Sequence, residues 1–171
     1  MEEGDLKAGY VLRERYRIVD RLGAGGFGTV WRAVDERTSL DVAVKVLHLR
    51  GTNAAAFEKQ QERFLTEGAI LERLDHPNIV RTLGRFLDGD RACLITELHP
   101  GITLRDVMLK RAEGDSEIRL DELDLVLRPL SAALVHAHDR GVVHRDFKPQ
   151  NIMLTEKGGE LSVRVLDFGI A

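Results

Sequence analysis

The sequence predicts an α+β fold in which a strand-rich first half is followed by a mainly helical second half. Three strand-like runs follow one another between Tyr16 and Leu47, and the short connections between them favour antiparallel pairing. Apolar residues then recur at helical spacing over residues 54–74 and again over residues 121–139. We therefore expect an antiparallel sheet with one major helix, followed by further helices and a pair of short strands.

Turn and breaker residues set the bounds of the expected elements. Strands are expected over residues 16–22, 29–34, 40–47, 79–88, 92–97, 152–155 and 163–166. Helices are expected over residues 54–74, 104–111 and 121–139. The breakers are a glycine-rich turn after residue 22, the polar segment 35–39, His76-Pro77, Asp88-Gly89-Asp90, Gly141 and Lys157-Gly158-Gly159.

This order of elements divides the chain into three parts. Residues 1–15 are charged and irregular and are expected to form a lead-in. Residues 16–99 form the strand-rich part, and residues 100–171 form the helical part, with the division near Pro100-Gly101.

The composition excludes several classes of protein. The 171 residues carry 25 Lys and Arg against 28 Asp and Glu, a formal net charge of −3, so nucleic acid is not expected as a partner. No apolar run approaches the ~20 residues of a membrane span, and the acidic N-terminus does not resemble a secretory signal. The single cysteine, Cys93, favours a reducing compartment. We expect a cytoplasmic protein, with a downstream membrane anchor left open if the chain is a fragment.

A glycine-rich segment, Gly23-Ala24-Gly25-Gly26-Phe27-Gly28-Thr29-Val30, follows the first expected strand. Glycine lets the backbone approach phosphate oxygens and permits positive φ, although the same pattern also occurs in tight hairpins. A dinucleotide-binding fold would place this loop before a helix. Here the chain continues as a strand, which favours a lid over nucleotide phosphates.

A lysine and a glutamate occupy positions where the pattern would otherwise be apolar. Lys45 is the one charge within the apolar run Val42–Leu47. Glu67 lies three residues after Phe64 and four before Leu71, so it shares the apolar face of the helix. A carboxylate on that face needs a cationic partner, because an unpaired buried charge is costly. We predict that Glu67 pairs with Lys45 beneath the lid and holds the lysine against nucleotide phosphates.

Polar side chains that suit phosphoryl transfer gather after the last long helix, in the segment 144–151. Asp146 can accept or orient a hydroxyl proton, and Lys148 can neutralise a transferring phosphoryl group. Asn151 can supply an oxygen ligand to Mg²⁺, and Asp167, in Asp167-Phe168-Gly169, can supply a second. Each piece alone is compatible with a polar loop, but together and in this order they favour a phosphotransferase.

With these motifs the chain resembles the protein kinases, and in detail the bacterial Hanks-type serine/threonine kinases, from about Tyr16 to Ala171. The resemblance implies a strand-rich N-lobe that ends in a hinge, followed by the first part of a helical C-lobe. It implies catalytic roles for Lys45, Glu67, Asp146 and Lys148, and Mg²⁺ ligation by Asn151 and Asp167.

The resemblance also implies an adenine-nucleotide site. Thr96 corresponds to the gatekeeper, the backbone of Glu97 and His99 to the adenine-binding hinge, and Met153 to the floor of the adenine site. The remaining expected nucleotide contacts are Leu22, Gly23, Gly25, Gly26, Gly28, Val30, Ala43 and Lys45. Thr82 departs from the family, which usually has an apolar side chain at this position.

The implied function is transfer of the ATP γ-phosphoryl group to Ser or Thr hydroxyls of a protein substrate in signalling, with Mg²⁺ as cofactor. Two other interpretations stay open. In one, the chain, which stops just after Asp167-Phe168-Gly169, is a truncated and catalytically silent nucleotide-binding module. In the other, it is a phosphotransferase for small molecules, which Lys148 and the complete glycine lid disfavour.

The helix expected over residues 121–139 is apolar nearly all round, the pattern of a helix that is buried on every side. Too little chain follows to cover it. We therefore expect an exposed apolar surface, marginal stability and self-association of the 171-residue form.

Overall fold

The structure is a computed structural model that describes residues 6–25, 28–48, 53–114 and 120–168. The chain forms two compact units. Of the described residues, the first unit contains those up to Glu72 together with Thr82–Leu98, and the second contains Arg73–Arg81 and residues 99–168. The short segment Arg73–Arg81 therefore belongs to the helical unit, although it lies within the strand-rich part of the sequence.

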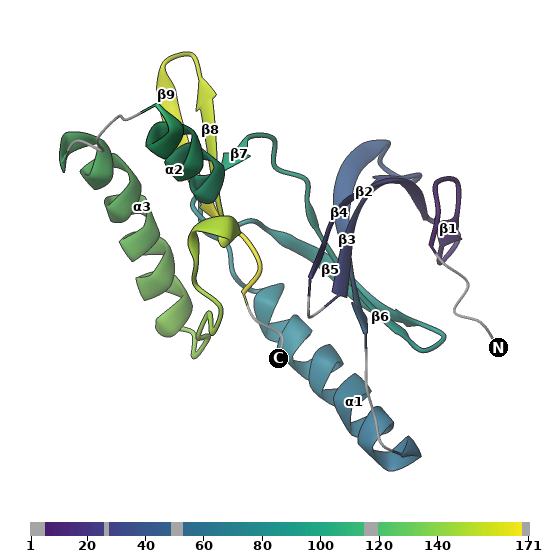
Figure 1. Cartoon of the computed structure of the whole chain (residues 1–171). Helices are drawn as coiled ribbons and strands as arrows, with labels where there is room; N and C mark the ends of the chain where they lie inside the picture. Colours follow the sequence, from purple (N-terminus) through teal and green to yellow (C-terminus); the bar gives the residue numbers. More distant parts are fainter. Residues whose placement is uncertain (1–5, 26–27, 49–52, 115–119, 169–171) are drawn as a thin grey trace. The chain divides into compact units, whose positions relative to one another are not determined.

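In the described part of the chain, the first unit forms a six-stranded antiparallel sheet with one helix (Figure 1). Its strands are β1 (Val11–Leu12), β2 (Tyr16–Gly25), β3 (Gly28–Asp35), β4 (Leu40–His48), β5 (Thr82–Asp88) and β6 (Arg91–Glu97). They lie in the order β1-β2-β3-β4-β6-β5. Consecutive strands β2, β3 and β4 pair antiparallel, which confirms the prediction from their short connections.

The two faces of this sheet have different roles, because successive side chains of a strand point to opposite faces. One face carries a buried apolar core. Its members are Leu12, Tyr16, Ile18, Ala33, Val42, Val44, Val46, Cys93 and Ile95. The alternation within β4 places Ala43 and Lys45 on the other face, where both are half-buried.

The segment expected to be an irregular lead-in contributes β1 to the sheet. Leu12 is fully buried in the core, and it lies opposite Tyr16 across the turn. Arg13 and Glu14 make this turn with left-handed φ values of 50° and 52°. A strand of two residues has no detectable periodicity, so the sequence pattern does not reveal it.

The helix of the first unit is α1 (Ala54–Leu71), which ends three residues earlier than expected. The side chain of Asn53 caps its N-terminus by accepting a hydrogen bond from a backbone N–H at 2.9 Å. The N–H of Glu72 donates to the carbonyls of Gly68 and Ile70 and closes the last turn. The buried side of the helix contains Phe64, Gly68 and Leu71, in agreement with the helical spacing of the sequence.

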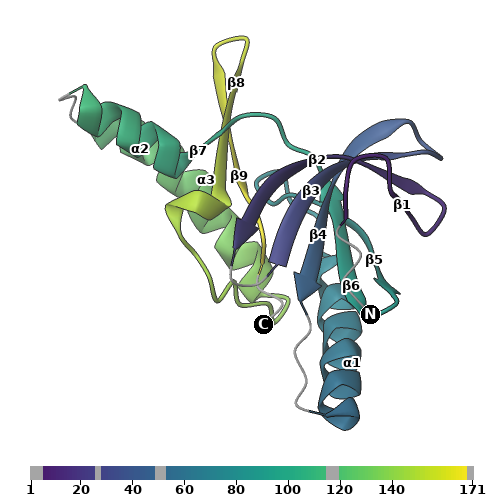
Figure 2. The same cartoon turned by 45° about the vertical axis from the view of Figure 1, so that its right-hand side comes forward.

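The second unit combines helices with a three-stranded sheet in its described residues (Figure 2). The helices are α2 (Leu104–Glu113), α3 (Leu120–His138) and the short 3₁₀ helix η1 (Pro149–Asn151). The strands are β7 (Ile102–Thr103), β8 (Ile152–Lys157) and β9 (Glu160–Val165), in the order β7-β8-β9. Helix α3 packs on β9.

The sequence pattern predicted a strand from Ile79, but strand β5 begins at Thr82. Ile79 instead forms a parallel bridge with Val165 of β9. The N–H of Val165 donates to the Asn78 carbonyl at 2.8 Å, and the N–H of Val80 donates to the Val165 carbonyl at 2.9 Å. Because these backbone groups are used by β9, they do not continue β5.

Helix α3 exposes the apolar surface that its sequence pattern predicted. Its buried side contains Val126, Leu130, Ala133 and Ala137. Its exposed apolar side chains are Leu123, Leu125, Leu127 and Val135. Within the described residues, none of the helices combines the length and apolar character needed to cross a lipid bilayer.

Candidate active site

The strand residues expected to bind a nucleotide lie in rows across one face of the first unit's sheet. In the first row, Gly23 lies opposite Val30, and Val30 lies opposite Lys45. Residues opposite one another share a face, with Cβ atoms about 4.5–5.5 Å apart. Leu22, beside Gly23, lies at an irregularity in the pairing and is exposed. The structure therefore brings the start of the glycine lid, Val30 and Lys45 together.

A second row lies beside the first on the same face. Ala43 is two residues from Lys45 along β4, and it lies opposite Thr96 of β6. The expected gatekeeper is thus a neighbour of the expected wall of the adenine site. Glu97 lies opposite Val42, so its side chain points to the other face and its backbone ends β6.

The glycines of the lid have different surroundings. Gly28 has a φ of +144°, and a Cβ at this position would overlap the backbone carbonyl of Val46. Only glycine fits where β3 begins against β4. A Cβ at Gly23 would meet open space, so the backbone there is accessible to a ligand. Gly25 pairs with Gly28, and Gly26 lies outside the described residues.

Glu67 lies on α1 with its side chain 24% exposed. It accepts a hydrogen bond of 2.8 Å from Nε of Arg63, one helical turn earlier. Their i,i+4 spacing is typical of an ion pair on one face of a helix. The pairing of Glu67 with Lys45 stays a prediction.

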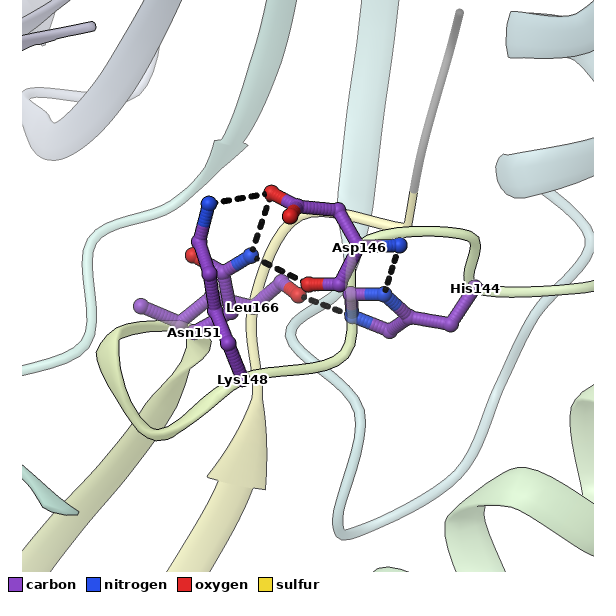
Figure 3. A network of polar contacts seen from close by, with 5 residues as sticks. All are labelled: His144, Asp146, Lys148, Asn151 and Leu166. Carbon is purple, nitrogen blue, oxygen red and sulfur yellow. Dashed lines mark hydrogen bonds and ion pairs between the residues drawn. The ribbon is translucent and has the colours of Figure 1, made fainter.

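In the second unit, the loop before β8 joins Asp146, Lys148 and Asn151 in one network (Figure 3). Nζ of Lys148 lies 2.6 Å from Oδ2 of Asp146, and Nδ2 of Asn151 donates to the same oxygen at 3.1 Å. The bond from Lys148 is the largest cause of a lowered pKa of Asp146, and the bond from Asn151 adds to it. Asp146 is therefore an ionised carboxylate at neutral pH.

The same network fixes the orientation of the Asn151 amide. Its Nδ2 donates both to Oδ2 of Asp146 and to the Asp146 backbone carbonyl, at 2.9 Å for the latter. The amide nitrogen thus serves two acceptors, which leaves the amide oxygen as the atom suited to ligate a cation. Asn151 is the buried last residue of η1, which holds this orientation.

His144 supports the loop from below. Its ring is buried, with 2% exposure, and Nε2 donates to the Leu166 carbonyl at 2.9 Å. Nδ1 accepts a longer bond from the N–H of Asp146, at 3.3 Å. The ring also lies against Phe168, with centroids 4.6 Å apart. Burial lowers the pKa of His144, so the histidine packs as a neutral ring.

Asp167 lies beside this loop in an uncommon backbone conformation. Its φ is +49°, and Arg145, which directly precedes Asp146, has a φ of +61°. Left-handed conformations cost about 1–2 kcal/mol for residues other than glycine and cluster at functional sites. The N–H of Leu166 donates to the Asn151 carbonyl at 2.8 Å, so the chain carries both expected Mg²⁺ ligands to one region of the second unit.

The donor set suits Mg²⁺ that arrives with phosphate. No cluster of three His, Cys, Asp or Glu side chains that would hold an ion by itself occurs among the described residues. The amide of Asn151 and the carboxylate of Asp167 are hard oxygen donors. Mg²⁺ typically takes one or two such protein ligands and completes its shell with water and phosphate oxygens.

The expected adenine contacts of the second unit lie near the start of its sheet. Met153 lies opposite Thr103 and is half-buried. Nε2 of His99 lies 3.3 Å from the hydroxyl of Thr155, and that hydroxyl also donates to the Pro100 carbonyl. Sequence reasoning missed Thr155, because this contact joins residues 55 apart and no local pattern signals it.

The curled antiparallel sheet with one helix, and the loop that joins an aspartate, a lysine and an asparagine, define a protein-kinase-like fold. The chain belongs to the protein kinase family, since the family model "Protein kinase domain" matches residues 16–171.

Known proteins of the family are similar along nearly the whole chain. Serine/threonine-protein kinase pkn2 of Myxococcus xanthus is 35% identical over 161 residues, which cover 94% of this chain and 18% of pkn2. Serine/threonine-protein kinase PknA of Mycobacterium tuberculosis is 38% identical over 170 residues, which cover 96% of this chain and 37% of PknA. The chain therefore spans less than two fifths of the length of these relatives.

The fold is also that of a solved kinase domain. The crystal structure of the Mycobacterium tuberculosis PknI kinase domain matches with a TM-score of 0.82 at 26% sequence identity. The match covers 98% of this chain and 64% of the PknI chain. These similarities confirm the predicted family and fold class.

Proposed function

We propose that this chain is the nucleotide-binding and catalytic-loop part of a serine/threonine protein kinase. It binds ATP with Mg²⁺ and transfers the γ-phosphoryl group to a Ser or Thr hydroxyl of a protein substrate. The observation that carries the proposal is the network of Asp146, Lys148 and Asn151. The names of the relatives, which are serine/threonine kinases, support the same reaction.

Five residues of the candidate site have defined parts in this proposal. The ionised Asp146 orients the acceptor hydroxyl and accepts its proton. Lys148, 2.6 Å from that carboxylate, offsets the negative charge of the transferred group. Lys45, beside the glycine lid, binds phosphate oxygens of the nucleotide. Mg²⁺, when bound, would neutralise phosphate charge, with Asn151 and Asp167 as its protein ligands.

The first experiment is MgATP binding to the full 171-residue chain, measured by thermal shift. A ligand that binds only the folded state raises apparent stability with its concentration. We expect a Mg²⁺-dependent rise that is lost in Lys45→Met and Asp167→Asn. Arg128→Ala, which removes an exposed ion pair with Asp124 on α3, is the control and should respond like wild type. A folded wild-type chain without any shift at millimolar MgATP would contradict nucleotide binding.

A second experiment separates the kinase from the silent module and from a small-molecule phosphotransferase. Wild type and Asp146→Asn are given MgATP with a Ser/Thr-rich protein acceptor, or with sugars and aminoglycosides. Transfer to protein that is lost in Asp146→Asn supports the proposal. Nucleotide binding without transfer favours the silent nucleotide-binding module. Transfer to the sugars or aminoglycosides alone favours a small-molecule phosphotransferase.

We further propose that the exposed apolar side of α3 drives self-association of this form of the chain. Leu125 and Val135 are 60% and 58% exposed. Large exposed apolar patches commonly mark sites of protein association. Light scattering after size exclusion should show concentration-dependent oligomers that the double variant Leu125→Glu/Val135→Glu reduces. A monomer at all concentrations would contradict this proposal.

We also propose a cytoplasmic location. Cys93 is buried in the sheet core, and burial raises the pKa of its thiol to about 12, so it remains an unreactive thiol. A chain with one such cysteine suits a reducing compartment. Localisation of a tagged chain by cell fractionation tests this proposal.

A further inference from the structure

We propose that Arg85 is a positioning residue for the nucleotide site, which fixes α1 on the sheet and thereby places the carboxylate of Glu67. The inference rests on the proposed function, because it concerns the residues that would hold the phosphates of ATP. Arg85 lies outside the glycine lid and the catalytic loop, and it is not one of the residues expected to contact the nucleotide.

The side chain of Arg85 crosses from β5 to α1 and binds the helix at two points. Its Nε donates to the backbone carbonyl of Leu65 at 2.5 Å, and its Nη1 pairs with the carboxylate of Glu72 at 2.5 Å. Leu65 and Glu72 are seven residues apart, about 10 Å along the helix axis, so the one guanidinium joins successive turns of α1. Because the guanidinium is planar and its donors have fixed directions, the two bonds together restrict both rotation and sliding of α1.

Gly68 provides the space that this arginine needs. It is buried in α1, directly after Glu67, and a Cβ at Gly68 would overlap Cδ of Arg85. Glycine is a poor residue for a helix interior, so local propensity does not explain its presence there. The close passage of Arg85 does explain it, and it brings the arginine stem to within one residue of the expected catalytic glutamate.

The sheet register connects Arg85 with the lysine of the site. Lys45 of β4 lies opposite Leu94 of β6, and Leu94 lies opposite Arg85 of β5. Lys45 and Arg85 therefore share one row and one face, two strands apart, at about 10 Å. Helix α1 packs on β5 and β6 (Figures 1 and 2), and the bonds of Arg85 to Leu65 and Glu72 place it on this face.

This arrangement lets Arg85 affect the binding of the nucleotide's phosphates. If α1 shifts, Glu67 moves relative to Lys45, and contacts to the phosphates weaken. The adenine contacts expected at Ala43 and Thr96 lie in the neighbouring row, which does not include Arg85. Loss of Arg85 should therefore weaken phosphate-bearing ligands selectively, which a general loss of stability would not do.

The test compares Arg85→Ala with wild type, in the full chain, by calorimetric titration with MgATP and with adenosine. We expect the affinity for MgATP to fall by roughly fivefold or more, while that for adenosine stays unchanged. Arg85→Lys, which keeps the charge but not the planar pair of donors, should restore only part of the affinity. The control Arg128→Ala should bind both ligands like wild type.

A double-mutant cycle with Lys45→Met then shows whether Arg85 acts through the lysine. We expect Lys45→Met/Arg85→Ala to bind MgATP no more weakly than Lys45→Met alone, since coupled residues are not additive. Additive losses, or an equal loss for MgATP and adenosine, would overturn the inference. If wild type binds no MgATP, the proposed function itself fails.

Gly68→Ala and Glu72→Gln keep the test open if Arg85→Ala does not fold. The alanine Cβ displaces the arginine stem, and Glu72→Gln removes the charge of its exposed partner. Each should lower the affinity for MgATP and leave that for adenosine unchanged. In a folded variant, wild-type affinity for MgATP in both cases would overturn the inference.

Discussion

Replacing Asp35 by asparagine should remove a specific part of the stability of the first unit. Asp35 ends β3 with 4% exposure, and its two carboxylate oxygens receive hydrogen bonds from Arg15 at 2.8 and 2.6 Å. The N–H of Arg37 adds a third bond at 3.1 Å. The Arg15 hydrogen bonds are the largest cause that lowers the pKa of Asp35 from 3.8 to about 2.

The size of the effect follows from this shift. One pKa unit corresponds to about 1.4 kcal/mol, so the full shift would amount to about 2 kcal/mol. Because the Arg15 side chain is 33% exposed and partly screened, we expect about 1–2 kcal/mol. The pKa of Asp35 is lower in the folded state, so the stabilisation is complete above pH 3.8. It is lost as the pH falls toward about 2.

Urea unfolding of wild type and Asp35→Asn at pH 6 and pH 3 measures this directly. At pH 6 the variant should be less stable by about 1–2 kcal/mol, and at pH 3 the difference should be about half as large. Asp20→Asn is the matched control, because Asp20 pairs with Arg32 on the same sheet but is exposed, and it should change stability little. An equal difference at both pH values would refute the reasoning.

Three further substitutions test the site. Gly28→Ala should destabilise the chain by about 1–3 kcal/mol in urea unfolding. Gly23→Ala should not, because a Cβ there meets open space. Equal effects of the two substitutions would contradict the steric argument. Lys148→Ala should lower the rate of phosphoryl transfer by about 10²-fold and raise the pKa of the catalytic carboxylate, so that the acid limb of the pH–rate profile moves to higher pH. Burial lowers the pKa of His144, so the stability of wild type should fall as the pH drops below 6.5. His144→Phe should weaken this pH dependence of stability. An unchanged dependence would contradict the buried neutral ring.

The residues of the candidate site were predictable where a local pattern marks them. The alternation within β4 places Lys45 half-buried on the face opposite the core, whereas its pairing with Glu67 stays a prediction. The helical spacing of Phe64 and Leu71 correctly marked the buried side of α1. Asp146 and Asn151 are only five residues apart in the sequence. The short 3₁₀ helix η1 between them is enough to bring their side chains into contact.

Other features depend on contacts between distant parts of the chain, and no local pattern encodes them. Residues 78–80 have the composition of a strand, but their hydrogen bonds go to Val165 and not to a neighbouring strand of the first unit. The helix partner of Arg85 lies 13–20 residues earlier in the sequence, and an arginine on an edge strand is usually solvated. Such pairings become visible only when the tertiary structure is known.

The pairing of β3 with β4 also limits how the length of this protein can vary. The two strands are matched residue by residue over their described length, from Gly28 opposite Leu47 to Asp35 opposite Leu40. Inserting or deleting one residue within β4 would turn Lys45 into the apolar core and expose its valine neighbours, because side chains alternate strictly between the faces. The turn at Gly158 and Gly159, which joins β8 to β9 and lies at the surface, has no such constraint. Viable length variants should therefore accumulate at that turn and be absent from β4.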